Sequence, residues 1–480
     1  MLEHMKPPSD CNPFLILGGE KWKPPQRVYA VLDQAEPTER GSVVLLFGAM
    51  DASALDARGD EIPRLSDARN FIEIYRRLPL FLLEAEFSRD AVLRLSDGTP
   101  RSLLEDDQAG SSDVPDAALA EALARLEGMW LTFRLEEAAN CARGSLYGNL
   151  FVDPEPIPIA EVSPPTGPAL QLLAHTDPLA GEPDATSDDI ENVLSAQGTP
   201  EAIAVYDVGQ GNSNGLLHDG RVVIYFDFGG GAGRNTKTFP SVLKKFCFCA
   251  TSSPPIVLSH WDHDHWSSEG RDTTSHYATW IAPRQTIHGG KRAPHHNALI
   301  TSIKKYGKLL IWPNTVSTLS VGKLRIHKCT GTVKNDSGLA MEIFPPDTAS
   351  GDSVLLPADA GYDDLPTGAS ITFDAIVCPH HGGKSNSPTV PSRPALTYAR
   401  LAYSYGPKNS YGHPLKPTFT AHDTANWADA RVRGSSVPIY VLNTEDRATC
   451  GLGHIGFDWG AVAFPVPPCK GTCELEIQQH

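Results

Sequence analysis

The segment from Pro254 to His265 constrains the fold of this chain more than any other. Its first half, Pro-Pro-Ile-Val-Leu-Ser, is a short apolar run typical of a buried strand. Its second half, His-Trp-Asp-His-Asp-His, places five ionisable side chains within six residues. A charge buried without a partner costs several kcal/mol, so a cation is the simplest way to satisfy the group together. Imidazole and carboxylate ligands suit Zn²⁺, Mn²⁺ or Fe²⁺, and the alternative is a solvated polar loop.

The length, charge and cysteine content exclude several classes of protein. A chain of 480 residues predicts more than one domain. The formal net charge of −16 argues against a broad grip on duplex DNA, although a local basic channel stays possible. No run of about 18 apolar residues is present, and the first five residues lack the pattern of a secretion signal. Nine cysteines, an odd number, argue against a disulfide framework. We therefore expect a cytoplasmic protein with no membrane association.

The first part of the chain, residues 1–152, shows mixed patterning. Residues 27–33 and 42–47 are rich in β-branched and aromatic residues, which predicts strands. Residues 68–87 and 116–142 carry apolar side chains at helical spacing. No catalytic cluster occurs here, so we expect a separate α+β domain of unknown role. It either recognises a substrate or protein partner or is a structural appendage.

The composition changes twice after that domain. Residues 153–200 contain nine prolines in an acidic stretch with little periodicity, which predicts a linker. From residue 201 onward, apolar strand-like runs return, and several end in an acid or a histidine. We therefore expect residues 201–480 to form one domain with its chemistry at strand ends.

Four further apolar runs repeat the design of the opening segment. Asp227 ends one apolar run and precedes three glycines, and Asp359 ends another. His380 and His381 follow a third run, and His413 follows a fourth. Of the 17 histidines, 11 lie between His260 and His413, which favours a built site over random placement.

Two other patterns need separate interpretation. His288, His295 and His296 lie in a segment that is expected to form a loop over the site, either as additional metal ligands or as ordinary loop residues. The segment Gly211–Gly215 matches the G-x-S-x-G nucleophile elbow. That motif requires a helix after the serine, whereas a turn and another strand are predicted here, so Ser213 is not expected to be a nucleophile.

The second half of the chain resembles the metallo-β-lactamase fold superfamily. More narrowly, it resembles the hydrolase domain of the ComEC-like competence proteins and their soluble, stand-alone bacterial relatives, over roughly residues 200–460. The motifs that carry the resemblance are Asp207-Val-Gly-Gln-Gly211, Phe226-Asp-Phe-Gly-Gly230, the H-x-D-x-D-H segment His260–His265, the polar turn with Asn335 and Ser337, Asp359, Pro379-His-His-Gly-Gly-Lys-Ser385, and Tyr411-Gly-His-Pro414. Asp262 departs from the commoner superfamily pattern, which has histidine there.

The resemblance implies a four-layer αββα sandwich with two divalent metal ions, Zn or Mn, at one edge. It assigns one ion to His260, Asp262 and His380, the second to Asp264 and His265, and a bridging position to Asp359. The carboxylate of Asp262 makes the site harder, which raises the preference for Mn²⁺ relative to Zn²⁺. Two such ions can activate a water and stabilise both the attacking and the leaving oxygen.

Several neighbouring residues receive roles from the same reasoning. Asp264, His381 and His413 are candidate catalytic residues, with His413 as general acid or as donor to a phosphate oxygen. His381 is also an alternative to His380 as metal ligand, because adjacent strand residues point in opposite directions and one of them faces the metals. Asp227 is expected to orient a metal-binding histidine through a hydrogen bond, and Lys384 and Ser385 are expected to contact a phosphate group of the substrate.

The leading expectation is therefore a metal-dependent phosphodiesterase, most of all a nuclease. Single-stranded nucleic acid would suit a pocket lined by Trp261, Trp266, Tyr405 and Tyr411, because bases stack on aromatic rings. One alternative is a hydrolase of a small phosphate ester, a cyclic nucleotide or an amide. Another is a non-catalytic binding module whose metals are structural and whose N-terminal domain docks a protein partner.

Overall fold

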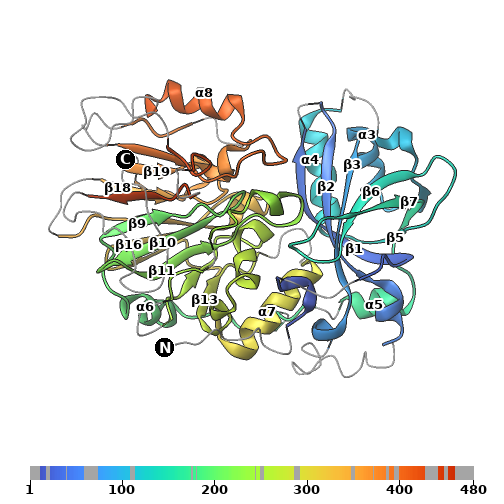
Figure 1. Cartoon of the computed structure of the whole chain (residues 1–480), viewed down its shortest axis with the longest axis horizontal. Helices are drawn as coiled ribbons and strands as arrows, with labels where there is room; N and C mark the ends of the chain where they lie inside the picture. The colour runs from blue at the N-terminus through green and yellow to red at the C-terminus, as the bar shows by residue number, and fades with distance from the viewer. Residues whose placement is uncertain are drawn as a thin grey trace. The chain divides into compact units, whose positions relative to one another are not determined.

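The computed structural model describes the chain in sixteen segments that make up two compact units. The described residues are 11–17, 22–38, 40–58, 74–108, 114–174, 177–179, 181–243, 245–248, 253–285, 292–347, 352–370, 372–384, 389–393, 399–427, 442–447 and 452–459. Unit 1 comprises Met1–Glu182 and Thr286–Lys305, and unit 2 comprises Pro183–Gln285 and Tyr306–His480, as far as they are described. Both units mix sheets with few helices, which confirms the α+β class (Figure 1).

Unit 1 is built on one antiparallel sheet of eight strands in the order β4-β8-β5-β1-β2-β3-β6-β7. Its strands are β1 (Arg27–Pro37), β2 (Val43–Asp51), β3 (Leu80–Phe87), β4 (Arg101–Ser102), β5 (Trp130–Arg134), β6 (Ala142–Tyr147), β7 (Glu155–Ile159) and β8 (Glu161–Ser163). Its helices are α1 (Ala52–Asp56), α3 (Arg89–Leu95), α4 (Asp116–Glu127), α5 (Pro168–Ala174) and α7 (Pro294–Tyr306), with 3₁₀ turns η1 (Pro13–Leu15) and η3 (Glu105–Gln108). Apolar residues of α3 and α4 share a buried core with one face of the sheet.

The structure corrects two helix predictions in unit 1. Residues 68–87 were expected to be helical, but 80–87 form strand β3, in which Phe81, Leu83 and Phe87 alternate toward the core. The predicted helix 116–142 ends at Glu127 and is followed by strands β5 and β6. Short apolar runs suit either element, and here cross-strand pairing decides between them. The predicted strands at 27–33 and 42–47 are confirmed as parts of β1 and β2.

The stretch predicted to be a linker, 153–200, is also structured. Strands β7 and β8 belong to the sheet of unit 1, whereas helix α6 (Ser187–Ser195) belongs to unit 2. Strand β7 tolerates its prolines because it is an edge strand. Ile157 and Ile159, which alternate with Pro156 and Pro158, belong to the core. The division into units therefore differs from the predicted boundaries at 152 and 200, and also places 286–305 with unit 1.

Unit 2 contains two seven-stranded sheets. The first has the order β14-β13-β12-β11-β10-β9-β22, with β9 (Ala202–Val205), β10 (Ser213–His218), β11 (Arg221–Phe228), β12 (Ile256–Val257), β13 (Thr279–Ala282), β14 (Lys308–Ile311) and β22 (Ile455–Asp458). The second has the order β15-β16-β17-β18-β19-β20-β21, with β15 (Thr318–Val321), β16 (Leu324–Lys328), β17 (Leu339–Ile343), β18 (Ser353–Leu356), β19 (Phe373–Val377), β20 (Arg400–Tyr403) and β21 (Leu442–Asn443). The 3₁₀ turns are η4 (Gly233–Thr238), η5 (His263–His265), η6 (Ser267–Gly270), η7 (Thr273–Tyr277), η8 (Asn335–Ser337), η9 (Tyr362–Asp364) and η10 (Pro379–Gly382).

The two sheets of unit 2 pack on one shared core. Alternate residues of the strands, such as Ile224 and Phe226 in one sheet and Met341 and Ile343 in the other, belong to the same buried cluster. The opposite face of the second sheet packs on helix α8 (Lys416–Thr424), which lies above β18 and β19 in Figure 1. This period-two burial follows from side chains that alternate along each strand.

Strand direction determines where the loops of unit 2 gather. Strands β11, β12, β13 and β14 run parallel, as do β18, β19, β20 and β21. The carboxyl ends of parallel strands open at a common edge, which is where α/β sheets place their ligands. Among the described helices, none is long and apolar enough to cross a membrane.

Candidate metal centre

Most of the histidines and acids singled out from the sequence lie together at these carboxyl ends. Asp227 is near the end of β11, and His260 follows β12 after two residues. Asp359 and His380 follow β18 and β19 in the same way. We call the resulting group the Asp359 centre, and it consists of His260, Asp262, Asp264, His265, Asp359, His380 and His381.

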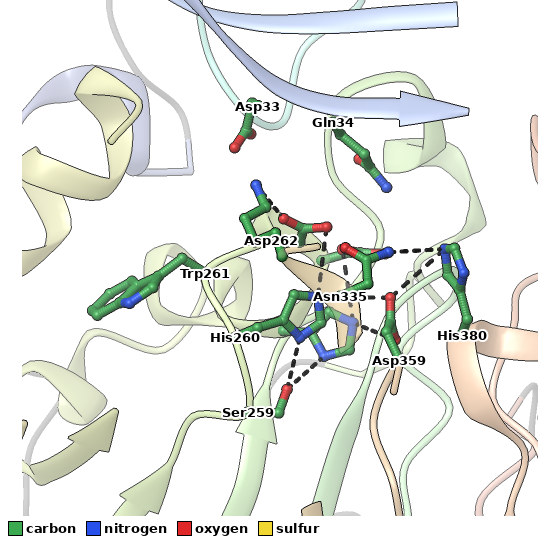
Figure 2. A network of polar contacts seen from close by, with 12 residues as sticks. Asp33, Gln34, Ser259, His260, Trp261, Asp262, Asn335, Asp359 and His380 are labelled. Carbon is green, nitrogen blue, oxygen red and sulfur yellow. Dashed lines mark hydrogen bonds and ion pairs between the residues drawn. The ribbon is translucent and has the colours of Figure 1, made fainter. Parts of the chain in front are cut away.

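Asp359 lies at the middle of this group and presents one carboxylate oxygen to each half. Its Oδ2 is 3.6 Å from His260 Nε2 and 3.7 Å from His380 Nε2. Its Oδ1 is 3.0 Å from His265 Nε2 and 3.6 Å from His381 Nε2. Figure 2 shows His260 and His380 turned toward Asp359 from different segments. One carboxylate therefore connects two pairs of imidazoles.

A second carboxylate completes each half. Asp262 Oδ2 lies 3.5 Å from His260 Nε2. Asp264 Oδ2 lies 3.4 Å from His381 Nε2, and its Oδ1 is 4.0 Å from His265 Nε2. Two ligand atoms bound to one tetrahedral ion at about 2.0–2.1 Å lie about 3.3 Å apart. Most of these histidine–carboxylate separations are close to that value. The ligand atoms of Asp264, His265 and His381 lie within 4.8 Å of one another, as do those of His260, His265 and Asp359.

The burial of the ligand atoms supports the same conclusion. His260 Nε2, His265 Nε2, His381 Nε2, Asp264 Oδ1 and Asp359 Oδ1 are buried and make no hydrogen bond within the described part of the chain. Leaving a buried polar atom unsatisfied costs about 1–3 kcal/mol, and more for a charged group. Cations in the two halves would satisfy these atoms together. The chain thus has a buried His/Asp cluster that fits metal ions.

The carboxylates and imidazoles of the centre stabilise one another's ionised forms. Burial alone would raise the pKa of the Asp359 carboxyl, but His265, His380 and His381 bring it well below its usual range. Burial likewise opposes ionisation of Asp264, yet the neighbouring imidazoles of His381 and His265 lower its pKa. For His265, burial lowers the pKa, whereas Asp359 and Asp227 raise it well above its usual range. The carboxylates are therefore ionised at neutral pH, as ligands must be.

Asp227 and Ser259 fix the orientation of the histidines. The Asp227 carboxylate accepts from Ser259 N at 2.7 Å and from Ser259 Oγ at 2.9 Å, and lies 2.8 Å from His265 Nδ1. Ser259 Oγ is also 3.0 Å from His260 Nδ1. With Nδ1 engaged, each ring directs Nε2 into the centre, which is how metal-binding histidines are usually oriented. The role expected for Asp227 matches this geometry, whereas Ser259 was missed.

The geometry overturns the expectation that only one of His380 and His381 faces the centre. Both Nε2 atoms lie within 3.7 Å of Asp359. The prediction assumed an extended strand, but the pair belongs to the turn η10, with φ of 49° and 55°. Left-handed backbone at two successive residues swings both side chains to one side. The Nδ1 of His381 is then held 2.8 Å from the Ser404 carbonyl.

Glycines near the centre allow two backbone segments to pack closely against the turn that carries Asp264. The carbonyl of Asp264 accepts from Asn212 N at 3.0 Å and Gly230 N at 3.1 Å. A Cβ on Gly229 would collide with that same carbonyl, and one on Gly211 would lie 2.6 Å from it. The two glycine-bearing loops thus clamp the turn that carries Asp264 and His265.

His413 lies beside the centre. Its ring is 5.5 Å from that of His380, and its Nδ1 is 3.3 Å from Gln210 Nε2. Asn409 Oδ1 accepts from the backbone N–H of His413 at 2.9 Å. Burial, together with His380 and His381, lowers the pKa of His413 well below its usual range. A neutral ring whose Nδ1 accepts from the Gln210 amide carries its proton on Nε2. A neutral imidazole of this kind suits a hydrogen-bond donor to a phosphate oxygen better than a general acid.

Other polar residues around the centre differ in how far they match the predictions. Lys384 is described, and its backbone carbonyl is 3.3 Å from His380 Nδ1, whereas Ser385 lies outside the described residues. Two residues with no assigned role also contact the centre. Lys334 forms an ion pair with Asp262, and Asn335 Nδ2 is 3.5 Å from His380 Nε2.

Three of the four aromatic residues expected to line a substrate pocket are buried. Trp261 and Trp266 donate their indole N–H groups to the carbonyls of Pro283 and Trp261, and Tyr405 donates to Glu445. Only Tyr411 is half-exposed; its ring lies 5.5 Å from that of His413. The predicted stacking platform is therefore wrong for Trp261, Trp266 and Tyr405, because their side chains are buried in the core.

Two of the three spare histidines belong to a helix and not to a loop. His295 and His296 are buried in the first turn of α7 in unit 1, where both contact Asp33. The expectation of exposed loop residues is wrong for these two. His288 lies outside the described residues.

Comparison with known proteins assigns no family to the chain. No protein-family model and no curated protein matches it. Among solved structures, a protein of unknown function from Enterococcus faecalis is similar over 37% of this chain, with 13% identity and a TM-score of 0.23. This chain spans 49% of the length of that protein. A similarity of that size carries no argument, so the functional evidence is the geometry of the centre.

Proposed function

We propose that the unit containing the Asp359 centre is a metal-dependent hydrolase of phosphodiester bonds, and that its substrate is a nucleic acid. The observation that carries the proposal is the position of Asp359, whose two carboxylate oxygens face different pairs of buried imidazoles. A carboxylate shared between two ligand groups would hold two ions close together, as in a dinuclear hydrolase. The shared core of two sheets and the outer helix α8 are compatible with the metallo-β-lactamase sandwich suggested by the motifs.

The two halves of the centre suit one ion each. His260, Asp262 and His380 would hold one ion with Asp359 Oδ2, and Asp264, His265 and His381 would hold the other with Oδ1. Bound divalent ions would supply an activated water and polarise the phosphoryl oxygen. This assignment makes His381 a ligand alongside His380, not its substitute.

The chain itself orients these groups and supplies positive charge. Asp227 and Ser259 hold His265 in place from behind, and Gln210 holds His413. His413 then offers an N–H to a phosphate oxygen. Lys334, paired with Asp262 at the edge of the centre, adds a cation that favours an anionic phosphodiester over a neutral amide.

A nucleic acid is favoured by the surroundings of His413. The half-exposed ring of Tyr411 lies next to His413, and the guanidinium of Arg234 lies 5.6 Å from the centroid of that ring. An aromatic face combined with a guanidinium suits a nucleotide, because bases stack on the ring and phosphate pairs with the charge.

The test is cleavage of labelled single-stranded DNA, duplex DNA and RNA, each with Mn²⁺, Zn²⁺ or EDTA. Bis(p-nitrophenyl) phosphate serves as a small phosphodiester and p-nitrophenyl phosphate as the monoester. We expect metal-dependent cleavage of diesters that falls below detection in Asp264→Ala/His265→Ala. The matched control is Glu201→Gln/His218→Gln, which alters a solvent-accessible histidine–carboxylate pair elsewhere in the same unit and should retain full activity.

The outcomes separate the reaction class from the substrate. Cleavage of the small diester without cleavage of nucleic acid would keep the phosphodiesterase and exclude the nuclease. Intact diesters under every condition, in protein shown to contain metal, would overturn the proposed function.

A further inference from the structure

Unit 1 contains a second buried histidine–carboxylate group that the proposed hydrolase does not use. Asp33, His295 and His296 present ligand atoms that all lie within 4.8 Å of one another. Asp33 Oδ2 is 3.1 Å from His295 Nε2, and its Oδ1 is 3.5 Å from His296 Nε2. All three side chains are at most 2% exposed.

The backbone is shaped to bring these side chains together. Asp33 falls at an irregularity of the β1–β2 pairing, where the register shifts between Leu32 and Gln34. Such bulges redirect a side chain, and here the redirected side chain is a buried acid. On the paired strand β2, Gly48 lies across from Val31, and a Cβ there would lie 2.5 Å from Ala293 Cβ and 2.9 Å from His295 Nδ1. Glycine at this position therefore lets the first turn of α7 approach strand β2.

The start of α7 is also held from its sides. Arg292 pairs with Asp177 at 2.7 Å, and Asn297 donates to the Tyr75 hydroxyl at 3.0 Å. These contacts position the two histidines before any ion is present. A preorganised group of this kind loses little side-chain entropy when it binds a ligand.

We propose that Asp33, His295 and His296 bind a divalent first-row transition ion, Zn²⁺ in the first instance, that ties strand β1 to helix α7. The two measured separations bracket the distance of about 3.3 Å expected between ligand atoms on one tetrahedral ion. The 3.5 Å separation exceeds the length of an ordinary hydrogen bond. Two imidazoles and one carboxylate select zinc-like ions over Ca²⁺ and Mg²⁺. The carboxylate offsets the repulsion between a cation and the positive end of the helix dipole.

The first test is the zinc content of the purified full-length chain after saturation with Zn²⁺ and removal of excess metal. Asp33→Asn and His296→Gln should each lower the content by one zinc per chain. His218→Gln is the matched control, because Glu201, His218 and Asp219 form a similar but more exposed group. Asp359→Ala should lower the content separately and additively, so failure of the proposed hydrolase and failure of this site give different results.

The second test does not depend on the variants folding. A zinc-edge anomalous map from crystals of the intact chain should show a peak within about 2.3 Å of the three ligand atoms, as zinc bond lengths require. An absent peak in zinc-saturated crystals would overturn the proposal. Unchanged zinc content in folded Asp33→Asn would do the same and leave a buried ion-paired cluster without metal.

Discussion

At the scale of single residues, the Asp359 centre depends on backbone positions as much as on ligands. Asp227, His380 and His381 all adopt positive φ, at 61°, 49° and 55°, which non-glycine residues rarely do. Left-handed backbone near the end of β11 and in the turn η10 after β19 directs these side chains into the centre. Such conformations cluster at sites where function requires them.

Gly229 packs tightly against the Asp264 carbonyl, and a substitution there tests whether this contact positions the centre. Gly229→Ala would place a methyl group against the Asp264 carbonyl, so the turn carrying Asp264 and His265 has to move. We expect a loss of bound metal together with a destabilisation of about 1–3 kcal/mol, as for overpacking. Gly322→Ala is the control, because φ there is 56° but nothing lies within 4 Å of the added Cβ. It should cost only about 1 kcal/mol of left-handed strain and leave metal binding unchanged.

Asp364 provides a prediction about pH. Burial and the neighbouring carboxylates of Asp336 and Asp363 raise the pKa of Asp364 from 3.8 to about 6. The folded chain therefore binds more protons than the unfolded chain between these pH values, and the group destabilises the fold progressively as the pH rises through that window. Asp364→Asn should raise the free energy of unfolding by about 1 kcal/mol at pH 7, after allowance for partial exposure, and by nothing at pH 3.

Urea unfolding of Asp364→Asn at the two pH values, with Asp219→Asn as a control on an exposed acid, measures this difference. An equal gain at both pH values would contradict the assigned cause.

At the scale of elements, the sheets of unit 2 are joined by a few buried polar contacts. Asp207, after strand β9, accepts from Arg447 Nε at 2.6 Å and from Gly453 N at 3.2 Å. The backbone N–H of Asp207 donates to His454 Nδ1 at 2.8 Å. The segment that begins with Asp207 thus anchors the segments at 442–447 and 452–459.

Removing Arg447 tests that anchor. Arg447→Met leaves the fully buried carboxylate of Asp207 without its cation, so we expect a destabilisation of about 3 kcal/mol. Asp207→Leu/Arg447→Met should recover part of the loss, because no uncompensated charge remains. Chemical unfolding of the two single variants and the double variant gives the coupling energy. Additive losses would show that the pair does not act as a unit.

At the scale of the whole molecule, burial of so many acids and histidines links stability to metal. A ligand that binds only the folded chain stabilises it by about 2.7 kcal/mol at a hundred times its dissociation constant. Zn²⁺ or Mn²⁺ should therefore raise the midpoint of thermal unfolding relative to EDTA-treated protein. Asp359→Ala should respond less than the parent chain, whereas His218→Gln should respond fully. An identical midpoint with and without metal would contradict both metal proposals.

Local sequence patterns were sufficient to predict the α+β class, the strands at 27–33 and 42–47, and the strands that are followed by His260, Asp359 and His380. These features are local. An apolar run that is followed at once by acids and histidines has few ways to bury its apolar side chains and also give the ionisable side chains partners. The same logic pointed to Asp227 behind the ligands.

The remaining features could be seen only in the folded chain, because they depend on contacts between distant segments. Cross-strand pairing made residues 80–87 a strand and brought β7 and β8 of the expected linker into a sheet. Backbone conformation turned His381 toward Asp359 beside His380. Packing buried Trp261 and Trp266 in the core, and it joined Asp33 to His295, 262 residues away in the chain, in a group that no local pattern predicts. Residue types and local apolar runs can be read from the sequence, whereas contacts between distant residues depend on the tertiary fold.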